Sequence, residues 1–255
     1  MARGHKDKIA VITGGAAGIG QAFAQRLAQD GCHIVSADLK HATETQKLVE
    51  AEGRKFLSCV CDVASQDSVH KLAEDVEKAF GRADILVNNA GIYPRREFLD
   101  MTFEDWRKVM SINLDAAFLT CKAFVPGMKQ RGWGRVVNMS SSTFGTVVPN
   151  YAHYIASKGG IVGFTRALAT DMGQFGVTVN AIAPSLTRSP GTLAQTPRLG
   201  ANSMEAEFEA LAKRQAIQRP EVPADLVGAL SFLTSDDAAY ITAQTLHVDG
   251  GFVRV

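Results

Sequence analysis

The sequence predicts an α/β fold, in which a doubly wound parallel β-sheet carries helices on both of its faces. Short apolar runs alternate with amphipathic stretches long enough for helices. A glycine-rich turn follows the first of these runs, and no linker, repeat or low-complexity tract interrupts the alternation. Because strands joined through helices form right-handed crossovers, we expect a parallel sheet. The 255 residues fit a single domain of this kind, spanning residues 1–255.

Taken in chain order, the predicted elements cover most of the sequence. Apolar runs predict strands at Ile9–Thr13, His33–Ala37, Lys55–Val60, Ile85–Asn88, Arg135–Met139, Val177–Ile182 and Thr245–Val248. Amphipathic stretches predict helices at Gln21–Asp30, Ser65–Phe80, Phe103–Arg131 and Tyr154–Phe175. The segment Pro184–Leu211, rich in Ser, Thr, Pro and Gly, interrupts this pattern. Such an insertion predicts a substrate lid over about residues 185–215.

Composition excludes several classes of function. The net charge is +1 and acids and bases are interspersed, so we expect neither a nucleic-acid partner nor a polybasic membrane anchor. The apolar run near the N-terminus is too short for a signal sequence or a membrane span. Cys32, Cys59, Cys61 and Cys121 lack the spacing of metal ligands. These features predict a cytoplasmic protein.

The turn after the first strand, Thr13-Gly14-Gly15-Ala16-Ala17-Gly18-Ile19-Gly20, opens the first predicted helix. Glycines let a pyrophosphate approach the backbone, and the helix N-terminus offers N–H groups to the phosphates. The alternative is a tight turn without a ligand, but the order strand, turn, helix favours a nucleotide. The spacing Gly-x-x-x-Gly-x-Gly differs from the commonest dinucleotide fingerprint. We expect contacts to the dinucleotide from Gly14, Ala17, Gly18, Ile19 and Gly20.

The end of the second strand predicts which dinucleotide binds. Asp38 and Leu39 stand there, and the glycine turn contains no arginine or lysine. An acidic residue at this place hydrogen-bonds the adenosine ribose of NAD, and its charge repels the 2′-phosphate of NADP. Lys40, the one nearby cation, is interpreted as a solvated surface residue. The sequence therefore predicts NAD as the cofactor.

Tyr154 and Lys158 stand four residues apart in a predicted helix. Positions i and i+4 lie on one face of a helix, so both side chains can point into one cleft. A nearby cation favours the phenolate and lowers the pKa of the phenol, toward the range useful for acid–base catalysis. Such a pair is frequent by chance; the glycine turn upstream and Ser140, Ser141 and Ser142 before it favour a catalytic role.

Together these motifs resemble the single-domain type of the short-chain dehydrogenase/reductase family, over essentially the whole chain. The resemblance rests on the glycine turn, Asp62-Val63, Asn88–Gly91, Asn113, Ser141 and the Tyr154/Lys158 pair, in this order. Within the family, Phe124–Arg135, Phe164–Ala169 and Asn180–Ser185 are most similar to NAD-dependent secondary-alcohol dehydrogenases of the 1-phenylethanol type. Pyridoxal-type dehydrogenases are the second match.

The resemblance implies a role for each site residue. Tyr154 would exchange the substrate hydroxyl proton, Lys158 would depress the tyrosine pKa and bind the nicotinamide ribose, and Ser141 would hold the substrate oxygen. Asn113 would hold a water that links Lys158 to solvent. Hydride would pass directly between substrate and nicotinamide, so no metal is required. The adenosine side of the cofactor would contact Asp62, Val63, Asn89, Ala90 and Gly91.

The resemblance leaves two assignments less certain. Counting from the preceding strand and from Tyr154 favours Ser141 over its neighbours, although Gly145 would suit Ser142 better. After the sixth strand the chain has Pro184-Ser185 where the family usually has Pro-Gly. Either Thr187 or Ser189 would then anchor the nicotinamide carboxamide.

The substrate pocket is predicted by position. We expect it to be lined by Tyr93, Thr143, Phe144 and Tyr151, together with residues of the lid. Their character favours an apolar or aromatic secondary alcohol or ketone. A sugar, sugar-acid or pyridoxal-like substrate is the alternative, but between Pro190 and Ala201 only Arg198 is charged. A catalytically silent NAD-binding regulator would have lost Ser141, Tyr154 or Lys158.

The long predicted helices also imply an assembly. Phe103–Arg131 and Tyr154–Phe175 are apolar on more than one side, and one sheet covers only one side. Thr245–Val248 would leave a sheet edge that needs cover. Closed twofold symmetry satisfies both needs and, repeated, predicts a homotetramer.

Overall fold

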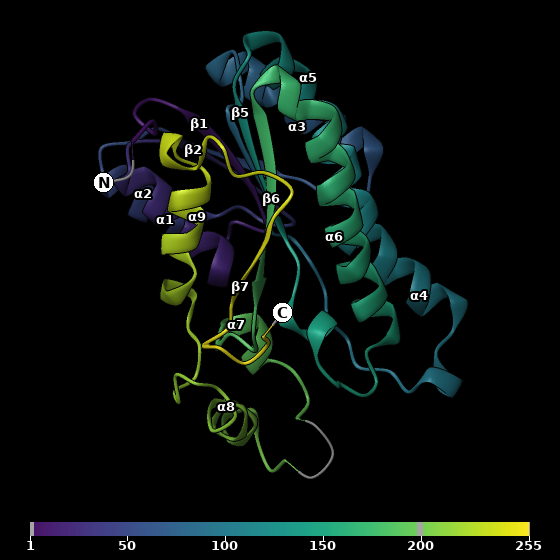
Figure 1. The fold of residues 1–255 in the computed structure, drawn as a ribbon. Coiled ribbons are helices and arrows are strands. Elements are labelled where there is room, and N and C mark those ends of the chain that lie inside the picture. Colours follow the sequence, from purple (N-terminus) through teal and green to yellow (C-terminus); the bar gives the residue numbers. More distant parts are fainter. Residues whose placement is uncertain (1–2, 198–200, 255) are drawn as a thin grey trace.

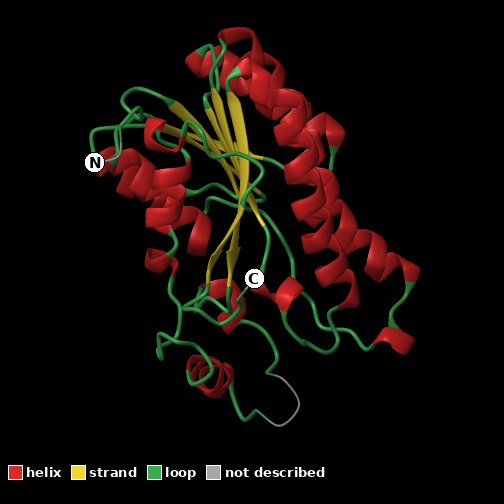
Figure 2. Ribbon diagram, viewed as in Figure 1, coloured by secondary structure: helices red, strands yellow, loops and turns green. Residues whose placement is uncertain are grey.

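The computed structural model describes residues 3–197 and 201–254. Its parallel sheet has seven strands in the order β3-β2-β1-β4-β5-β6-β7, which confirms the predicted doubly wound topology (Figure 1, Figure 2). The strands are β1 (Ile9–Thr13), β2 (His33–Asp38), β3 (Phe56–Val60), β4 (Ile85–Asn88), β5 (Gly134–Met139), β6 (Val177–Pro184) and β7 (Thr245–Val248). As expected, β7 forms an edge of this sheet.

Helices cover both faces of the sheet (Figure 1). One face carries α1 (Gly18–Gln29), α2 (Thr43–Ala51) and α9 (Val227–Leu233), and the other carries α3 (Gln66–Phe80), α5 (Ala116–Arg131) and α6 (Ala152–Met172). Successive strand residues point to opposite faces. In β1, Val11 therefore joins the core under α3 and α5, and Ile12 joins the core under α1 and α9.

The predicted strands agree with the observed ones to within two residues, but three helices, α2, α7 and α9, were not expected. In α2 only Thr45 and Val49 are buried, so its sequence has little apolar periodicity. The helix α9 is only seven residues long. The predicted lid contains α7 (Pro190–Leu193) and α8 (Met204–Ala212) beyond the carboxyl end of β6. Arg198 lies outside the described residues.

A continuous helical segment spans Phe103–Arg131, as the sequence predicts. It consists of α4 (Phe103–Met110), a π-helical turn at Ser111–Asp115, and α5. By length and composition this segment could cross a membrane. However, α5 buries Cys121, Phe124 and Met128 against the sheet, which is typical of a core helix.

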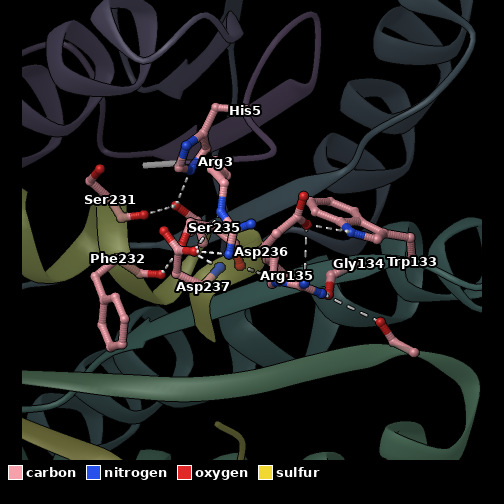
Figure 3. Close-up of polar contacts among 12 residues, drawn as sticks. Arg3, His5, Trp133, Gly134, Arg135, Ser231, Phe232, Ser235, Asp236 and Asp237 are labelled. Atoms are coloured by element: carbon pink, nitrogen blue, oxygen red, sulfur yellow. Dashed lines mark hydrogen bonds and ion pairs between the residues drawn. The ribbon is translucent and has the colours of Figure 1, made fainter. Parts of the chain in front are cut away.

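A cluster of polar residues closes the amino end of the sheet (Figure 3). There Arg3 pairs with Asp237 at 2.6 Å, which ties the N-terminal segment to the chain after α9. The buried guanidinium of Arg135, at the start of β5, donates to the carbonyl of Ser235 and lies 3.7 Å from the carboxylate of Asp236. Its carbon Cζ also lies 4.4 Å from the ring centre of Trp133. This cluster is at the opposite end of the strands from the predicted site.

Candidate active site

The glycine turn and the start of α1 form an open cradle. Ala17 occupies the N-cap in an extended conformation, with no side-chain hydrogen bond to the first turn of the helix. The N–H groups of that turn are therefore left to a ligand, and a phosphate suits them. A Cβ at Gly20 would lie 2.1 Å from the carbonyl oxygen of Gly14, so no larger residue fits there. The structure thus agrees with a phosphate site at the predicted turn.

Hydrogen bonds hold the ends of β1, β2 and β4 together around this cradle. Asp38 accepts from the N–H of Ala16 at 3.0 Å, which places its carboxylate beside the turn. Asn89 donates to the carbonyls of Thr13 and Gly14 at 2.9 and 3.1 Å. The carboxyl ends of adjacent parallel strands are the usual place for a dinucleotide in this topology. Asp38 and Asn89 therefore face the region expected for adenosine.

A cavity of about 210 Å³ lies beside them, at the carboxyl ends of β1 to β4. Apolar side chains and glycines form its walls, and two carboxylates lie at its rim. Its lining includes Gly14, Asp38, Leu39, Asp62, Val63, Ala90 and Gly91. Leu39 is 74% exposed, so an adenine ring in this cavity would bury apolar surface on it. The predicted adenosine contacts are brought together here.

Tyr154 and Lys158 lie on the first turns of α6, with Ser141 opposite them at the end of β5. Burial raises the pKa of the Tyr154 phenol to about 12, and the hydrogen bond with Ser141 acts in the opposite direction. Lys158 donates to the carbonyl of Met139 at 2.7 Å, and burial lowers its pKa to about 8. The expected depression of the phenol pKa is wrong for this chain, because desolvation of the phenol outweighs the effect of its hydrogen bond with Ser141.

The π-helical turn carries Asn113 into the same site. Its Oδ1 accepts from the N–H of Ile92 and its Nδ2 donates to the carbonyl of Ile92, both at 2.8 Å. A Cβ at Gly91 would lie 3.2 Å from Asn113 Oδ1 and 3.7 Å from Lys158 Nζ. Asn113 and Lys158 therefore meet over Gly91. Single π turns occur frequently at functional sites.

The loop after β6 holds both candidate anchors for the carboxamide. Thr187 donates its hydroxyl hydrogen to the carboxylate of Glu221, and Ser189 caps α7 by accepting from the N–H of Thr192. The same Glu221 accepts from the N–H of Ser185 at 3.1 Å, and burial raises its pKa to about 7. Ser185, the departure from the usual Pro-Gly, is thus part of a buried network.

A second cavity, of about 130 Å³, extends from Ser141 and Tyr154 toward the lid. Three of the predicted pocket residues, Tyr93, Thr143 and Tyr151, line it. Phe144 does not: its side chain is 55% exposed and its ring lies over Gly159 of α6. The other lining residues include the apolar Ile19, Val147, Val148, Leu186, Leu211 and Phe252 and the polar Arg95, Thr192, Gln195 and Arg214.

The residues at this site that were not found from the sequence include Arg95, Glu221 and Phe252. Arg95 donates to the hydroxyl of Tyr151 at 3.0 Å and pairs with Glu207 at 2.7 Å. Phe252 comes from the C-terminal segment, more than a hundred residues from Ser141 in the chain. Each reaches the site through tertiary contacts alone, so no local pattern could indicate it. The double arginine after Tyr93-Pro94 was the one weak signal.

Comparisons with known proteins agree with this geometry. A family profile described as enoyl-(acyl carrier protein) reductase matches residues 14–253. The chain is 35% identical over 252 residues to 2-dehydro-3-deoxy-D-gluconate 5-dehydrogenase of Escherichia coli (strain K12), covering 97% of this chain and 96% of that protein. It is 33% identical over 250 residues to a hydroxy(phenyl)methyl-succinyl-CoA dehydrogenase subunit of Thauera aromatica, covering 97% of both.

Among solved structures, levodione reductase superposes with a TM-score of 0.92 at 31% identity, covering 96% of this chain and 97% of that one. This likeness agrees with the sheet order, with the cradle at α1 and with the profile match over nearly the whole chain. The chain belongs to the short-chain dehydrogenase/reductase family of oxidoreductases, which act on alcohol and ketone groups and use a nicotinamide dinucleotide.

Proposed function

We propose that this chain is an NAD-dependent dehydrogenase of a secondary alcohol, or reductase of the matching ketone, with Tyr154 as the general acid and base. One observation carries the proposal: the buried phenol of Tyr154, hydrogen-bonded to Ser141, lies at the inner end of a mostly apolar cavity. Lys158 and the cofactor cradle adjoin it on the other side. The four cysteines are free and buried, which supports a cytoplasmic location.

The chain's own residues bind the substrate oxygen and transfer the proton of the substrate hydroxyl. Ser141 donates to the substrate oxygen and steadies the charge that develops on it. Tyr154 takes the hydroxyl proton in oxidation and returns it in reduction. The ammonium of Lys158 favours the phenolate whenever the phenol gives up its proton. Asn113, which meets Lys158 over Gly91, orders the route by which that proton reaches solvent. The nicotinamide ring, when bound, accepts or supplies the hydride.

Asp38 supports NAD over NADP. Its carboxylate is fixed beside the turn by the N–H of Ala16, and Leu39 beyond it offers no positive charge. A 2′-phosphate next to this carboxylate would meet like charge. The residues expected to hold NAD are the turn residues Gly14 to Gly20, Asp38, the lining of the 210 Å³ cavity, and Thr187 or Ser189 on the nicotinamide side.

The apolar lining of the substrate cavity supports an aromatic or alicyclic substrate over a polyol. The Thauera relative, named for an aryl carbinol, agrees with this class. The gluconate-type relative keeps a sugar acid as the second candidate. Arg95, Gln195 and Arg214 are among the polar groups in the cavity that favour it.

The test follows NADH absorbance against matched panels of aryl secondary alcohols, alicyclic ketones and sugar acids, with NAD and NADP in parallel. Oxidation of an aryl carbinol with NAD, at least tenfold faster than any sugar acid, is the expected result. Turnover of sugar acids alone would show that the substrate is a sugar acid and not an aromatic or alicyclic alcohol or ketone. No turnover on any panel, with NAD still binding, would favour a silent NAD-binding regulator.

We expect a homotetramer in solution. Phe118 on α5 is 52% exposed, and an open groove beside it is lined by Leu114, Phe118, Leu119 and Phe164. These residues come from the two long helices, and β7 leaves a sheet edge. Light scattering at micromolar concentration should give about four times the 27.3 kDa chain mass. A mass near one chain would refute assembly, and a mass near two would refute the tetramer.

A further inference from the structure

Two arginines line the substrate cavity, and their surroundings differ. Arg95 is paired with Glu207 at 2.7 Å and also donates to the carbonyl of Thr196. Arg214 forms no ion pair with any residue in the described ranges. Its carbon Cζ lies 5.0 Å from the ring centre of Phe252. No Asp or Glu is among the described residues that line the cavity, so the charge of Arg214 is not neutralised there.

Phe252 holds this guanidinium at the cavity because its own segment is fixed. The buried carboxylate of Asp249 accepts from the N–H groups of Gly251, Phe252 and Val253 at 3.0, 3.1 and 2.9 Å. One carboxylate thereby folds the C-terminal segment into a tight turn. A Cβ at Gly145 would lie 2.6 Å from a methyl carbon of Val253, so this segment packs directly on the turn after Ser141.

The chain around Arg214 is attached to the same segment. The N–H of Ile217 donates to the carbonyl of Gly250 at 2.9 Å, and the N–H of Arg214 donates to the carbonyl of Leu211 at the end of α8. These bonds fix the backbone around Arg214, and the Phe252 ring lies beside its exposed guanidinium, so the side chain loses less conformational freedom when it binds an anion. Arg214 is therefore positioned as a recognition group at the mouth of the cavity.

We propose that Arg214 binds a carboxylate on the substrate, so that the enzyme acts on secondary alcohols or ketones that carry an acid group. A guanidinium presents two parallel N–H donors that match a carboxylate. Arg214 supplies a single positive charge, which one carboxylate neutralises and a phosphate dianion exceeds. The apolar wall between Tyr154 and Arg214 would receive the body of the substrate. The inference rests on the proposed function and narrows its substrate class to acids.

The experiment compares acetylbenzoate with its methyl ester as ketone substrates, using NADH. Arg214→Gln removes the positive charge, and Arg214→Lys keeps the charge but lacks the two parallel N–H donors of the guanidinium. Lys213→Gln is the matched control, because Lys213 is exposed and does not line the cavity. We expect the wild type to prefer the acid by about 10- to 100-fold in kcat/KM, mainly through KM. Arg214→Gln should lose this preference, Arg214→Lys should keep part of it, and Lys213→Gln should keep all of it.

A second measurement needs no turnover: the rise in Tm that benzoate causes, compared with neutral benzamide. Benzoate should stabilise the wild type more than benzamide does, and Arg214→Gln should remove the difference. Equal kcat/KM for acid and ester in the wild type, or an unchanged preference in Arg214→Gln, would overturn the proposal. If neither ketone is reduced, the proposed reaction fails for these ketones, and the Tm comparison alone decides the role of Arg214.

Discussion

The charged side chains at the two ends of the sheet have different kinds of partner. At the amino end, Arg3 pairs with Asp237 and Arg135 with Asp236. At the carboxyl end, Lys158 donates to the carbonyl of Met139 and lies 5.7 Å from the ring centre of Tyr154, and the exposed Arg214 lies beside the ring of Phe252. Glu221 is buried there among hydroxyl and N–H donors. Ion pairs also occur at this end: Arg95–Glu207 is largely buried, whereas Arg188–Glu205 and Arg219–Asp225 are more exposed.

The difference separates structural charges from functional ones. A buried charge without a counter-charge costs free energy, and the chain meets that cost partly through shifted pKa values. Burial shifts the pKa values of Lys158 and Glu221 toward their neutral forms; it also lowers the pKa of Arg135, but there the neighbouring Asp236 opposes the shift. The amino end neutralises itself within the chain. The carboxyl end leaves polar groups that remain available to a ligand.

The largest effect is expected from removing a polar atom at the carboxyl end. Tyr154→Phe keeps the ring and deletes the proton carrier, so turnover should fall by about 10²–10⁴-fold while NAD still binds. Trp133→Phe is the matched change at the amino end, where it removes the N–H that donates to Asp236 together with part of the ring beside Arg135. It should leave kcat unchanged. Residual activity of Tyr154→Phe above about a tenth of wild type would remove Tyr154 from its role.

The second prediction concerns the pH dependence of stability. The folded-state pKa of Glu221 is raised from 4.5 to about 7 by burial, so the folded chain holds a proton that the unfolded chain has lost. The free energy of unfolding should therefore fall as pH rises from about 4.5 to 7, by roughly 3 kcal/mol, and stay level above. Glu221→Gln should abolish this fall. Exposed Glu205, changed to Gln, is the control. Urea unfolding at fixed protein concentration measures the free energy of unfolding of both variants at each pH. If Glu221→Gln kept the wild-type pH dependence, the raised pKa of Glu221 would be contradicted.

Arg135→Met tests whether the charged residues at the amino end contribute to stability and not to activity. It leaves the carbonyls of Ser235 and Gly134 without their donor inside the protein, which should lower the free energy of unfolding by about 2 kcal/mol. Because Arg135 lies at the far end of the strands, kcat and the cofactor Kd should not change. A loss of kcat in the folded variant would break the separation between the two ends.

The smallest effect is expected in cofactor choice. Asp38→Ser removes the charge that opposes a 2′-phosphate, so the ratio of kcat/KM for NAD to that for NADP should fall by about tenfold. Lys40→Gln, two residues further on, should leave the ratio unchanged. Equal use of both cofactors by the wild type would contradict the role given to Asp38.

Local patterns in the sequence predicted most of the fold and much of the site. Gly14 to Gly20, Asp38 and the Tyr154/Lys158 pair each belong to a strand end or helix start that the sequence marks clearly, and the resemblance added Asn113 and Ser141. The structure groups them at one edge of the sheet.

Residues that reach the site from a distance could not be predicted in this way. Glu221 meets Thr187 across 34 positions, and Phe252 meets Arg214 through a turn that Asp249 makes. The pKa of Tyr154 was predicted in the wrong direction for a related reason. Its burial depends on Tyr93 and Tyr151, which pack against its ring only in the fold.

The turn made by Asp249 has a practical consequence for producing the protein. A purification tag fused after residue 255 would be separated by only three residues from Phe252, which lines the cavity proposed for the substrate. Linker residues there would compete with substrate for the mouth of the cavity and add their own charges beside Arg214. The N-terminus, held by Arg3 near the far end of the strands, is the safer point of fusion.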